Sequence, residues 1–362
     1  MPNKVEKFVM LPASCVLAIL MMEIIVRMLD ISPRPLAPLP ISTYRLSANP
    51  AIRYEYRPGY RPTDQPFDGS HKGFAINRAG FRDYEYPEQK PEGTYRIVVL
   101  GNSTTAGNGV ANLDNIYTKR LEKLLNTSTD PSIRYEVLNM GVGGYQPLQE
   151  IETLREKGLK YNPDMVLVTF STNDFELRTD GGVYGRLLAT NKNYVGIYDK
   201  LLRQSRLAFI LNYRFKIALK TYDEISLKTY DEIYIKDILK GQTTVRAGLS
   251  LLSKLQEEHG FIAIAVILPA FNAHFDEYKF GHIHEKVFRS AEDLSNIELI
   301  DLLQSFARVD NNADKFSYDG VHMNEYGHDV MAKILLPIVQ AFSKRRTELQ
   351  SERRSSTGRA PH

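Results

Sequence analysis

Five short apolar runs rich in β-branched residues, separated by longer helical patterns, constrain the fold of this chain more than any other feature. The runs are RIVVL at 96–100, YEVLNM at 135–140, DMVLVTF at 164–170, FIAIAVIL at 261–268 and IELIDL at 297–302. Runs of this kind are typical of strands buried on both faces, and their alternation with helices implies a parallel sheet. The sequence therefore predicts a three-layer α/β domain over about residues 95–345.

The segments between the runs carry helix signals. Asp114 is suited to cap a helix, Pro147 suits a first helical turn, and Gly158 and Gly260 stand where helix ends are expected. Residues 175–243 form a long insertion in which KTYDEI occurs twice, and we expect it to be helical and partly exposed.

The N-terminal region predicts a membrane anchor over residues 1–30. The stretch Phe8 to Leu29 is almost continuously apolar and about long enough to cross a ~30 Å hydrocarbon core. Glu23 and Arg27 interrupt it, but they are four residues apart and can pair on one helix face. The alternatives are a cleaved signal peptide, for which no small-residue cleavage site is present, and a buried core helix.

Two further segments lack clear periodicity. Residues 31–94 are rich in Pro, Arg and Tyr, which predicts an irregular extension or linker, and residues 346–362 are charged, which predicts a disordered tail.

Composition excludes several classes of function. The formal net charge of +3 is nearly balanced, so no basic face for nucleic acid is expected. Cys15 is the only cysteine, which excludes an intrachain disulfide and a thiolate metal cluster. His282 and His284 lack a third convincing ligand, so we expect neither a metal site nor a cofactor.

Ser103 directly follows the first run, in the sequence LGNSTTAGNG. This position at the carboxyl end of a strand is where parallel sheets expose reactive side chains. A serine helix cap is the simpler reading, and a phosphate loop is disfavoured because the GK[ST] ending is missing.

Asp319 and His322 form a D-x-x-H motif near the end of the chain. A carboxylate at this spacing can orient one ring nitrogen of His322 while the other faces Ser103. His328, six residues later, is expected to be structural.

Gly144 and Asn173 follow the second and third runs. With the backbone N–H of Ser103, a backbone N–H at Gly144 and the amide of Asn173 could surround an oxyanion. Alternatively, these residues serve only in turns.

The order of these blocks resembles that of the SGNH hydrolase family, whose blocks are GDS, a glycine, G-x-N-D and D-x-x-H. Here they correspond to Gly101 to Ser103, Gly144, Ser171 to Asp174 and Asp319 to His322. Asn102 replaces the family's aspartate, which keeps the size but removes a charge, and Ser171 replaces a glycine. The resemblance covers about residues 70–340 and implies a flavodoxin-like sheet in an αβα sandwich, with Ser103, Asp319 and His322 as the triad.

The resemblance also implies a function. The lead-in to the first run and the apolar N-terminus look like the bacterial membrane-tethered branch of the family, which implies a single-pass membrane protein with an extracytoplasmic hydrolase domain. We expect an acylated small molecule or carbohydrate as substrate, with hydrolysis and acyl transfer both open. Alternatives are a non-catalytic glycan-binding or scaffold domain, and a lipase or thioesterase acting on membrane lipid.

Overall fold

The computed structural model describes residues 4–29, 41–62, 73–128, 132–175, 183–188, 205–208, 210–211, 230–271 and 274–357. Its centre is a parallel sheet of five strands in the order β4-β3-β5-β6-β7. The strands are β3 (Thr94–Gly101), β4 (Arg134–Asn139), β5 (Met165–Phe170), β6 (Ile262–Ile267) and β7 (Ile297–Asp301). This order is flavodoxin-like and confirms the predicted fold class.

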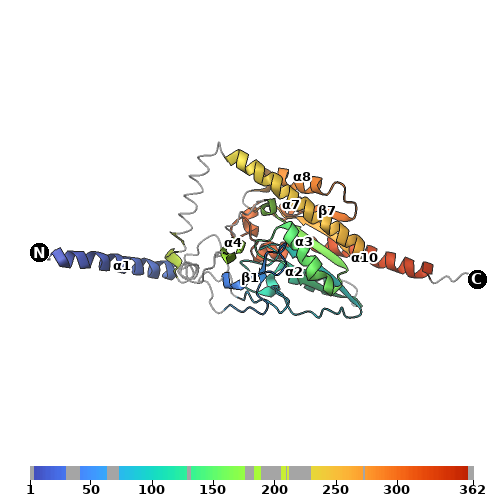
Figure 1. The fold of residues 1–362 in the computed structure, drawn as a ribbon, viewed down its shortest axis with the longest axis horizontal. Coiled ribbons are helices and arrows are strands. Elements are labelled where there is room, and N and C mark those ends of the chain that lie inside the picture. The colour runs from blue at the N-terminus through green and yellow to red at the C-terminus, as the bar shows by residue number, and fades with distance from the viewer. Residues whose placement is uncertain are drawn as a thin grey trace, which may run out of the picture.

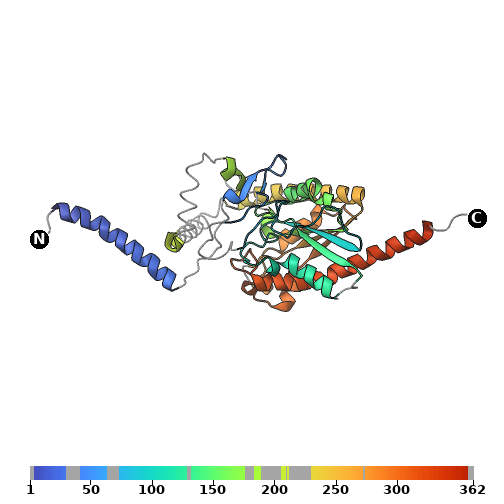
Figure 2. The same cartoon turned by 90° about the horizontal axis from the view of Figure 1, so that it is seen from below.

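Successive strand residues point to opposite sides of the sheet, so the apolar strands present apolar side chains on both faces. Helices cover both faces. Val98 and Leu100 of β3 belong to one buried apolar cluster, and Ile97 and Val99 belong to the other. The first cluster packs under α3 (Pro147–Glu156), α7 (Tyr230–His259) and α8 (Gly281–Ser290). The second packs under α2 (Tyr117–Ser128), α9 (Leu303–Val309) and α10 (Glu325–Thr357), and Figure 2 shows α2 and α10 together on this face.

The segment predicted as an irregular extension or linker packs against the α/β domain. Its described residues contain the 3₁₀ turn η1 (Ile41–Thr43) and one antiparallel pair, β1 (Tyr44–Leu46) and β2 (Tyr54–Tyr56), joined by turns and irregular segments. Tyr56, Phe74 and Ile76 are fully buried and belong to the first apolar cluster. These contacts fit a wrapping extension better than a free linker.

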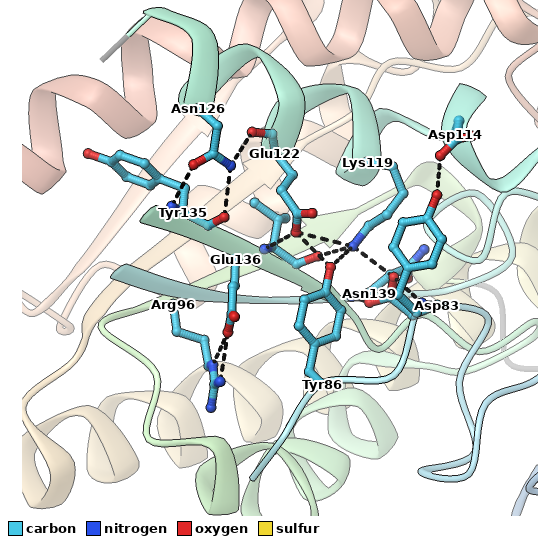
Figure 3. A network of polar contacts seen from close by, with 12 residues as sticks. Asp83, Tyr86, Arg96, Asp114, Lys119, Glu122, Asn126, Tyr135, Glu136 and Asn139 are labelled. Atoms are coloured by element: carbon cyan, nitrogen blue, oxygen red, sulfur yellow. Dashed lines mark hydrogen bonds and ion pairs between the residues drawn. The ribbon is translucent and has the colours of Figure 1, made fainter. Parts of the chain in front are cut away.

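A buried ion pair ties this extension to α2 and β4 (Figure 3). The ammonium group of Lys119 lies 2.7 Å from the carboxylate of Asp83 and donates to the hydroxyl of Tyr86 at 2.8 Å and to the carbonyl of Val137 at 2.5 Å. Asp83 also accepts the backbone N–H of Asn139 at 2.6 Å. Burial raises the pKa of Asp83 to about 6, against the opposing effect of Lys119.

The N-terminal segment is a helix, α1 (Lys4–Met28), which stands apart from the α/β domain (Figure 1). Glu23 pairs with Arg27 at 2.7 Å and accepts hydrogen bonds from the hydroxyl of Ser205 and the N–H of Leu207, both at 2.9 Å. No helix within the ranges given above is both long and apolar enough to cross a membrane. The prediction of a membrane span is therefore not supported, and charged side chains with polar partners interrupt the described part of this helix.

The C-terminal helix extends further than expected. Helix α10 continues to Thr357, whereas the sequence predicts a disordered tail from residue 346. Most positions in residues 346–354 are Glu, Gln, Arg or Leu, which favour helix. Most of the predicted insertion 175–243 lies outside the described residues, apart from α4 (Val183–Leu188), two short pieces and the start of α7.

Candidate active site

Ser103 lies in a tight turn directly after β3. The carbonyls of Asn102 and Ser103 accept the N–H groups of Ala106 and Asn108, each at 3.0 Å, which closes the turn over the carboxyl end of the sheet. Gly101 is required by close approach, because a Cβ there would lie 2.1 Å from the hydroxyl oxygen of Thr105. The turn therefore holds Ser103 at the edge of the sheet, as its place in the sequence predicts.

The structure brings Ser103, His322 and Asp319 into one hydrogen-bonded row. The Nε2 atom of His322 lies 3.0 Å from the hydroxyl oxygen of Ser103, and its Nδ1 atom lies 2.8 Å from a carboxylate oxygen of Asp319. The side chain of His322 is 22% exposed and that of Asp319 is 8% exposed. A solvent-accessible imidazole with a buried carboxylate behind it is suited to accept a proton from Ser103.

The loop Ser317–Met323 holds the carboxylate and the imidazole at this spacing. One oxygen of Asp319 accepts the backbone N–H groups of His322 at 2.8 Å and Val321 at 3.1 Å. The other oxygen lies against Nδ1 of the His322 ring. Burial opposes ionisation of Asp319, but the hydrogen bonds and charge of His322 keep its pKa below the usual value. Asp319 is thus an anion poised to stabilise an imidazolium.

A second Asp–His pair, Asp301 at the end of β7 and His284 on α8, is linked to this loop by hydrogen bonds through Tyr278. His284, which is buried, lies 2.8 Å from both the carboxylate of Asp301 and the hydroxyl of Tyr278. That hydroxyl accepts the N–H of Ala270 at 3.0 Å, and the next residue, Phe271, donates to the carbonyl of Gly320 at 2.8 Å. Both ring nitrogens of His284 therefore have hydrogen-bond partners in the packing behind the loop.

Gly144 lies in a glycine-rich loop that packs against the turn containing Ser103. Val142 donates to the carbonyl of Gly101 at 3.0 Å, and a Cβ on Gly141 would lie 2.5 Å from the backbone nitrogen of Ala106. Gly144 has a φ of +82°, which favours glycine. Asn173 lies in the 3₁₀ turn η4 (Thr172–Phe175) after β5, and its side chain lies outside the described part of the structure.

The two departures from the family pattern contact each other. The amide of Asn102 donates to the hydroxyl of Ser171 at 2.7 Å and to the carboxylate of Asp174 at 3.0 Å. The same carboxylate accepts the N–H of Ser171 at 2.7 Å. Asp174 was not singled out from the sequence as a site residue, although its place beside Asn173 at the end of the third run was the available signal.

A second carboxyl group lies close to this network. Glu150 on α3 is buried, and neither of its carboxylate oxygens has a hydrogen-bond partner among the described residues. Burial, with repulsion from Asp174, raises the pKa of Glu150 well above the usual value. Burial and the nearby carboxylate thus favour the neutral form of Glu150, whereas the hydrogen bonds that Asp174 accepts favour its ionised form.

His328 is structural in its contacts, as the sequence predicts. It is fully buried on α10, stacks on Tyr117 and accepts the N–H of that residue at 3.2 Å through Nδ1. Burial, with the nearby positive charges of Arg82 and Arg120, lowers the pKa of His328 to about 3.

Comparison with known families gives the class of this protein. The family described as GDSL-like Lipase/Acylhydrolase matches residues 99–330, well over half of the 362 residues. The chain belongs to the GDSL-like lipase/acylhydrolase family. This membership confirms the family expected from the sequence and supports the expected enzyme class, an SGNH-type hydrolase.

Solved structures similar to this GDSL-like acylhydrolase include a two-domain esterase active on acetylated mannans, crystallised with mannopentaose. That similarity has 14% identity and a TM-score of 0.40 and covers 68% of this chain and 49% of the esterase, so this chain spans about half its length. A lipase/acylhydrolase from Enterococcus faecalis matches at 18% identity and a TM-score of 0.41, over 68% of this chain and 96% of that one. An acetylxylan esterase from Geobacillus stearothermophilus matches at 16% identity and a TM-score of 0.41, over 67% and 93%. No curated protein matches this acylhydrolase.

Proposed function

We propose that this acylhydrolase cleaves carboxylic esters through an acyl-enzyme on Ser103, with His322 as general base and Asp319 as its orienting carboxylate. The observation that carries the proposal is the row of two contacts, 3.0 Å from Ser103 to His322 and 2.8 Å from His322 to Asp319. Both distances are within hydrogen-bond reach, which proton transfer requires.

In the acylation step, His322 takes the hydroxyl proton while the oxygen of Ser103 attacks the ester carbonyl. The ionised carboxylate of Asp319 stabilises the imidazolium that forms. His322 then gives the proton to the leaving alcohol, and the acyl group stays on Ser103. In the second step, His322 takes a proton from a water molecule whose oxygen attacks the acyl carbonyl. The bond to Ser103 then breaks, the acid is released, and His322 returns the proton to the serine oxygen.

The developing oxyanion requires hydrogen-bond donors. We assign this role to the backbone N–H groups of Ser103 and Gly144 and to the side-chain amide of Asn173. The packing of the Gly144 loop against the nucleophile turn supports the first two assignments, and the place of Asn173 after β5 supports the third. Such donors stabilise charge that appears only in the transition state.

The substrate class that we propose is an O-acylated carbohydrate, with water or a sugar hydroxyl as the acceptor of the acyl group. This proposal rests on the sequence resemblance, and the extracytoplasmic placement that the resemblance implies also stays a prediction. Because a serine triad needs only a nucleophilic hydroxyl in the second step, both acceptors use the same residues.

The test is an ester panel assayed with the full chain. Release of acetate from an acetylated xylo- or manno-oligosaccharide is compared with hydrolysis of a long-chain p-nitrophenyl ester and of an acyl thioester, each against Ser103→Ala. Preference for the acetylated sugar supports the proposal, and transfer to an added unacetylated sugar identifies the acceptor. Preference for the long-chain ester or the thioester would overturn the carbohydrate assignment, and no turnover of any substrate would overturn catalysis by Ser103.

A further inference from the structure

Two tyrosines of the N-terminal hairpin bind one residue of the glycine loop. Tyr54 and Tyr56 are two positions apart on β2, so their side chains share a face, and both are buried. The hydroxyl of Tyr54 donates to the carbonyl of Gly143 at 3.1 Å, and the N–H of Gly143 donates to the hydroxyl of Tyr56 at 2.8 Å. Both backbone polar groups of Gly143 are therefore held by phenol side chains from a segment almost ninety positions earlier in the chain.

The contact with the Gly143 carbonyl fixes the direction of the next N–H group. The carbonyl of Gly143 and the N–H of Gly144 belong to the same peptide unit, which is planar, and in a trans unit the two groups point in opposite directions. The N–H of Gly144 donates no hydrogen bond to any residue that the structure describes. Its direction is thus determined by the peptide plane, and the hydroxyl of Tyr54 holds that plane.

The hairpin is itself fixed on the domain. The hydroxyl of Tyr145 donates to the carbonyl of Tyr54 at 2.6 Å, and the amide of Gln149 donates to the carbonyl of Ile52 at 2.8 Å. On the opposite face of β2, Glu55 pairs with Lys157 at 2.5 Å. These contacts hold β2 in place, so the hydroxyl of Tyr54 can hold the Gly143–Gly144 peptide plane.

Gly143 has no side chain at the point where the tyrosines approach. A Cβ there would lie 3.0 Å from the hydroxyl of Tyr44 and 3.2 Å from that of Tyr56. Burial raises the pKa of Tyr56 to about 12, so this phenol stays neutral at physiological pH. The hydroxyls of Tyr44, Tyr54 and Tyr56 therefore form a compact cradle around Gly143.

We infer that Tyr54 is a positioning residue for the oxyanion hole, which it serves by orienting the Gly143–Gly144 peptide so that the Gly144 N–H faces the reacting carbonyl. The inference rests on the proposed function. A hydrogen bond to the carbonyl also polarises the peptide, which strengthens its N–H as a donor. Tyr54 acts through Gly144 and does not touch the substrate.

The experiment compares Tyr54→Phe with Tyr135→Phe in the full chain. Tyr135 is also a buried tyrosine, but its hydroxyl contacts Ser343 at 3.4 Å, on the α10 side of the sheet. We expect Tyr54→Phe to lower kcat about 10- to 100-fold with KM nearly unchanged, which is less than the ~10²–10³-fold typical for removing a donor. Inhibition by phenylboronic acid, which forms a tetrahedral adduct with serine, should weaken by a similar factor in Tyr54→Phe and stay unchanged in Tyr135→Phe.

Equal kcat in the two variants, with an active wild type, would overturn this inference and leave the proposed function standing. An inactive wild type would instead overturn the proposed function. If Tyr54→Phe does not fold, a structure of the wild type with phenylboronic acid decides the matter. A Gly144 nitrogen within about 3 Å of a boronate oxygen supports the inference, and an adduct whose oxygens lie beyond hydrogen-bond reach of that nitrogen overturns it.

Discussion

Asn102, the residue before the proposed nucleophile, donates a 3.0 Å hydrogen bond from its side-chain amide to the carboxylate of Asp174. An aspartate at position 102, as the family pattern has it, would place a second carboxylate against Asp174. Ser171, the other departure, accepts from the same amide at 2.7 Å. The two departures are therefore joined by a hydrogen bond, and both donate to the carboxylate of Asp174.

Asn102→Asp is expected to destabilise the protein because the new carboxylate meets that of Asp174. Like charges raise the pKa of the new group, so the destabilisation is absent at low pH and appears as pH rises through that raised pKa. We expect a loss of about 1–3 kcal/mol, or roughly 2–10 °C in Tm, at about pH 8 and little loss at about pH 4. Thermal unfolding at both pH values measures it.

The double variant Asn102→Asp with Asp174→Asn is the matched control. It exchanges the amide and the carboxylate, so one donor again faces one acceptor. We expect it to recover most of the Tm lost at high pH. A double variant as unstable as Asn102→Asp would show that the contact between positions 102 and 174 is not the cause.

Asp319→Asn is expected to lower kcat by about 10⁴-fold, the loss measured for this change in a well-studied serine protease triad. An amide at this position can turn its N–H toward the imidazole, which favours the wrong tautomer of His322. KM should change little, because the carboxylate acts on the base and not on the substrate. Steady-state kinetics are compared with those of Asp310→Asn, which removes a carboxylate outside the site and should leave kcat unchanged. Equal kcat in the two variants would mean that Asp319 is only a turn residue.

Acid should destabilise the protein through His328. Its pKa is about 3 in the folded protein against an ordinary value of 6.5, so the unfolded chain binds a proton more readily than the folded one. Stability is therefore fully present above about pH 6.5 and falls as pH decreases toward 3, by about 2 kcal/mol at about pH 5. His328→Asn, which keeps an acceptor for Tyr117, should flatten this slope in urea unfolding, whereas the exposed His282→Asn should not; a slope unchanged in His328→Asn contradicts the assignment.

Lys119→Met is expected to cost about 3–5 kcal/mol at about pH 8, because it leaves the buried carboxylate of Asp83 without its partner. The cost should shrink toward about pH 5, where Asp83 can take up a proton. Arg246→Met is the control, since the side chains of Arg246 and Asp293 are 55% and 63% exposed, and it should cost less than about 1 kcal/mol. Equal losses in urea unfolding would mean that burial does not distinguish the two pairs.

The sheet could be predicted because its central strands β3, β5 and β6 are buried on both faces and leave continuous apolar runs in the sequence. The row of Ser103, Asp319 and His322 could be predicted because strand ends converge at one edge of a parallel sheet. The D-x-x-H spacing is itself local, since one carboxylate bonds both the backbone and the ring of His322. These features depend on residues that lie close together in the sequence or directly after a strand, so the sequence pattern shows them.

The tyrosine cradle could not be predicted because its parts are far apart and its strands are only three residues long. No periodicity marks Tyr54 as a partner of Gly143. The contact of Asn102 with Asp174 was missed for the same reason, since it joins two loops that meet only after the sheet has formed. The anchor was inferred from hydropathy alone, which does not register the polar contacts of Glu23.

The most direct test of the central claim is covalent labelling of the full-length protein with a fluorophosphonate, read by intact mass and peptide mapping. A serine activated by His322 at 3.0 Å should be phosphonylated at Ser103 in one equivalent, and neither Ser103→Ala nor His322→Ala should be labelled at a comparable rate. Ser171→Ala, which removes a nearby serine outside the row, should be labelled like the wild type. Labelling at a different serine, or equal labelling of Ser103→Ala, would contradict the account.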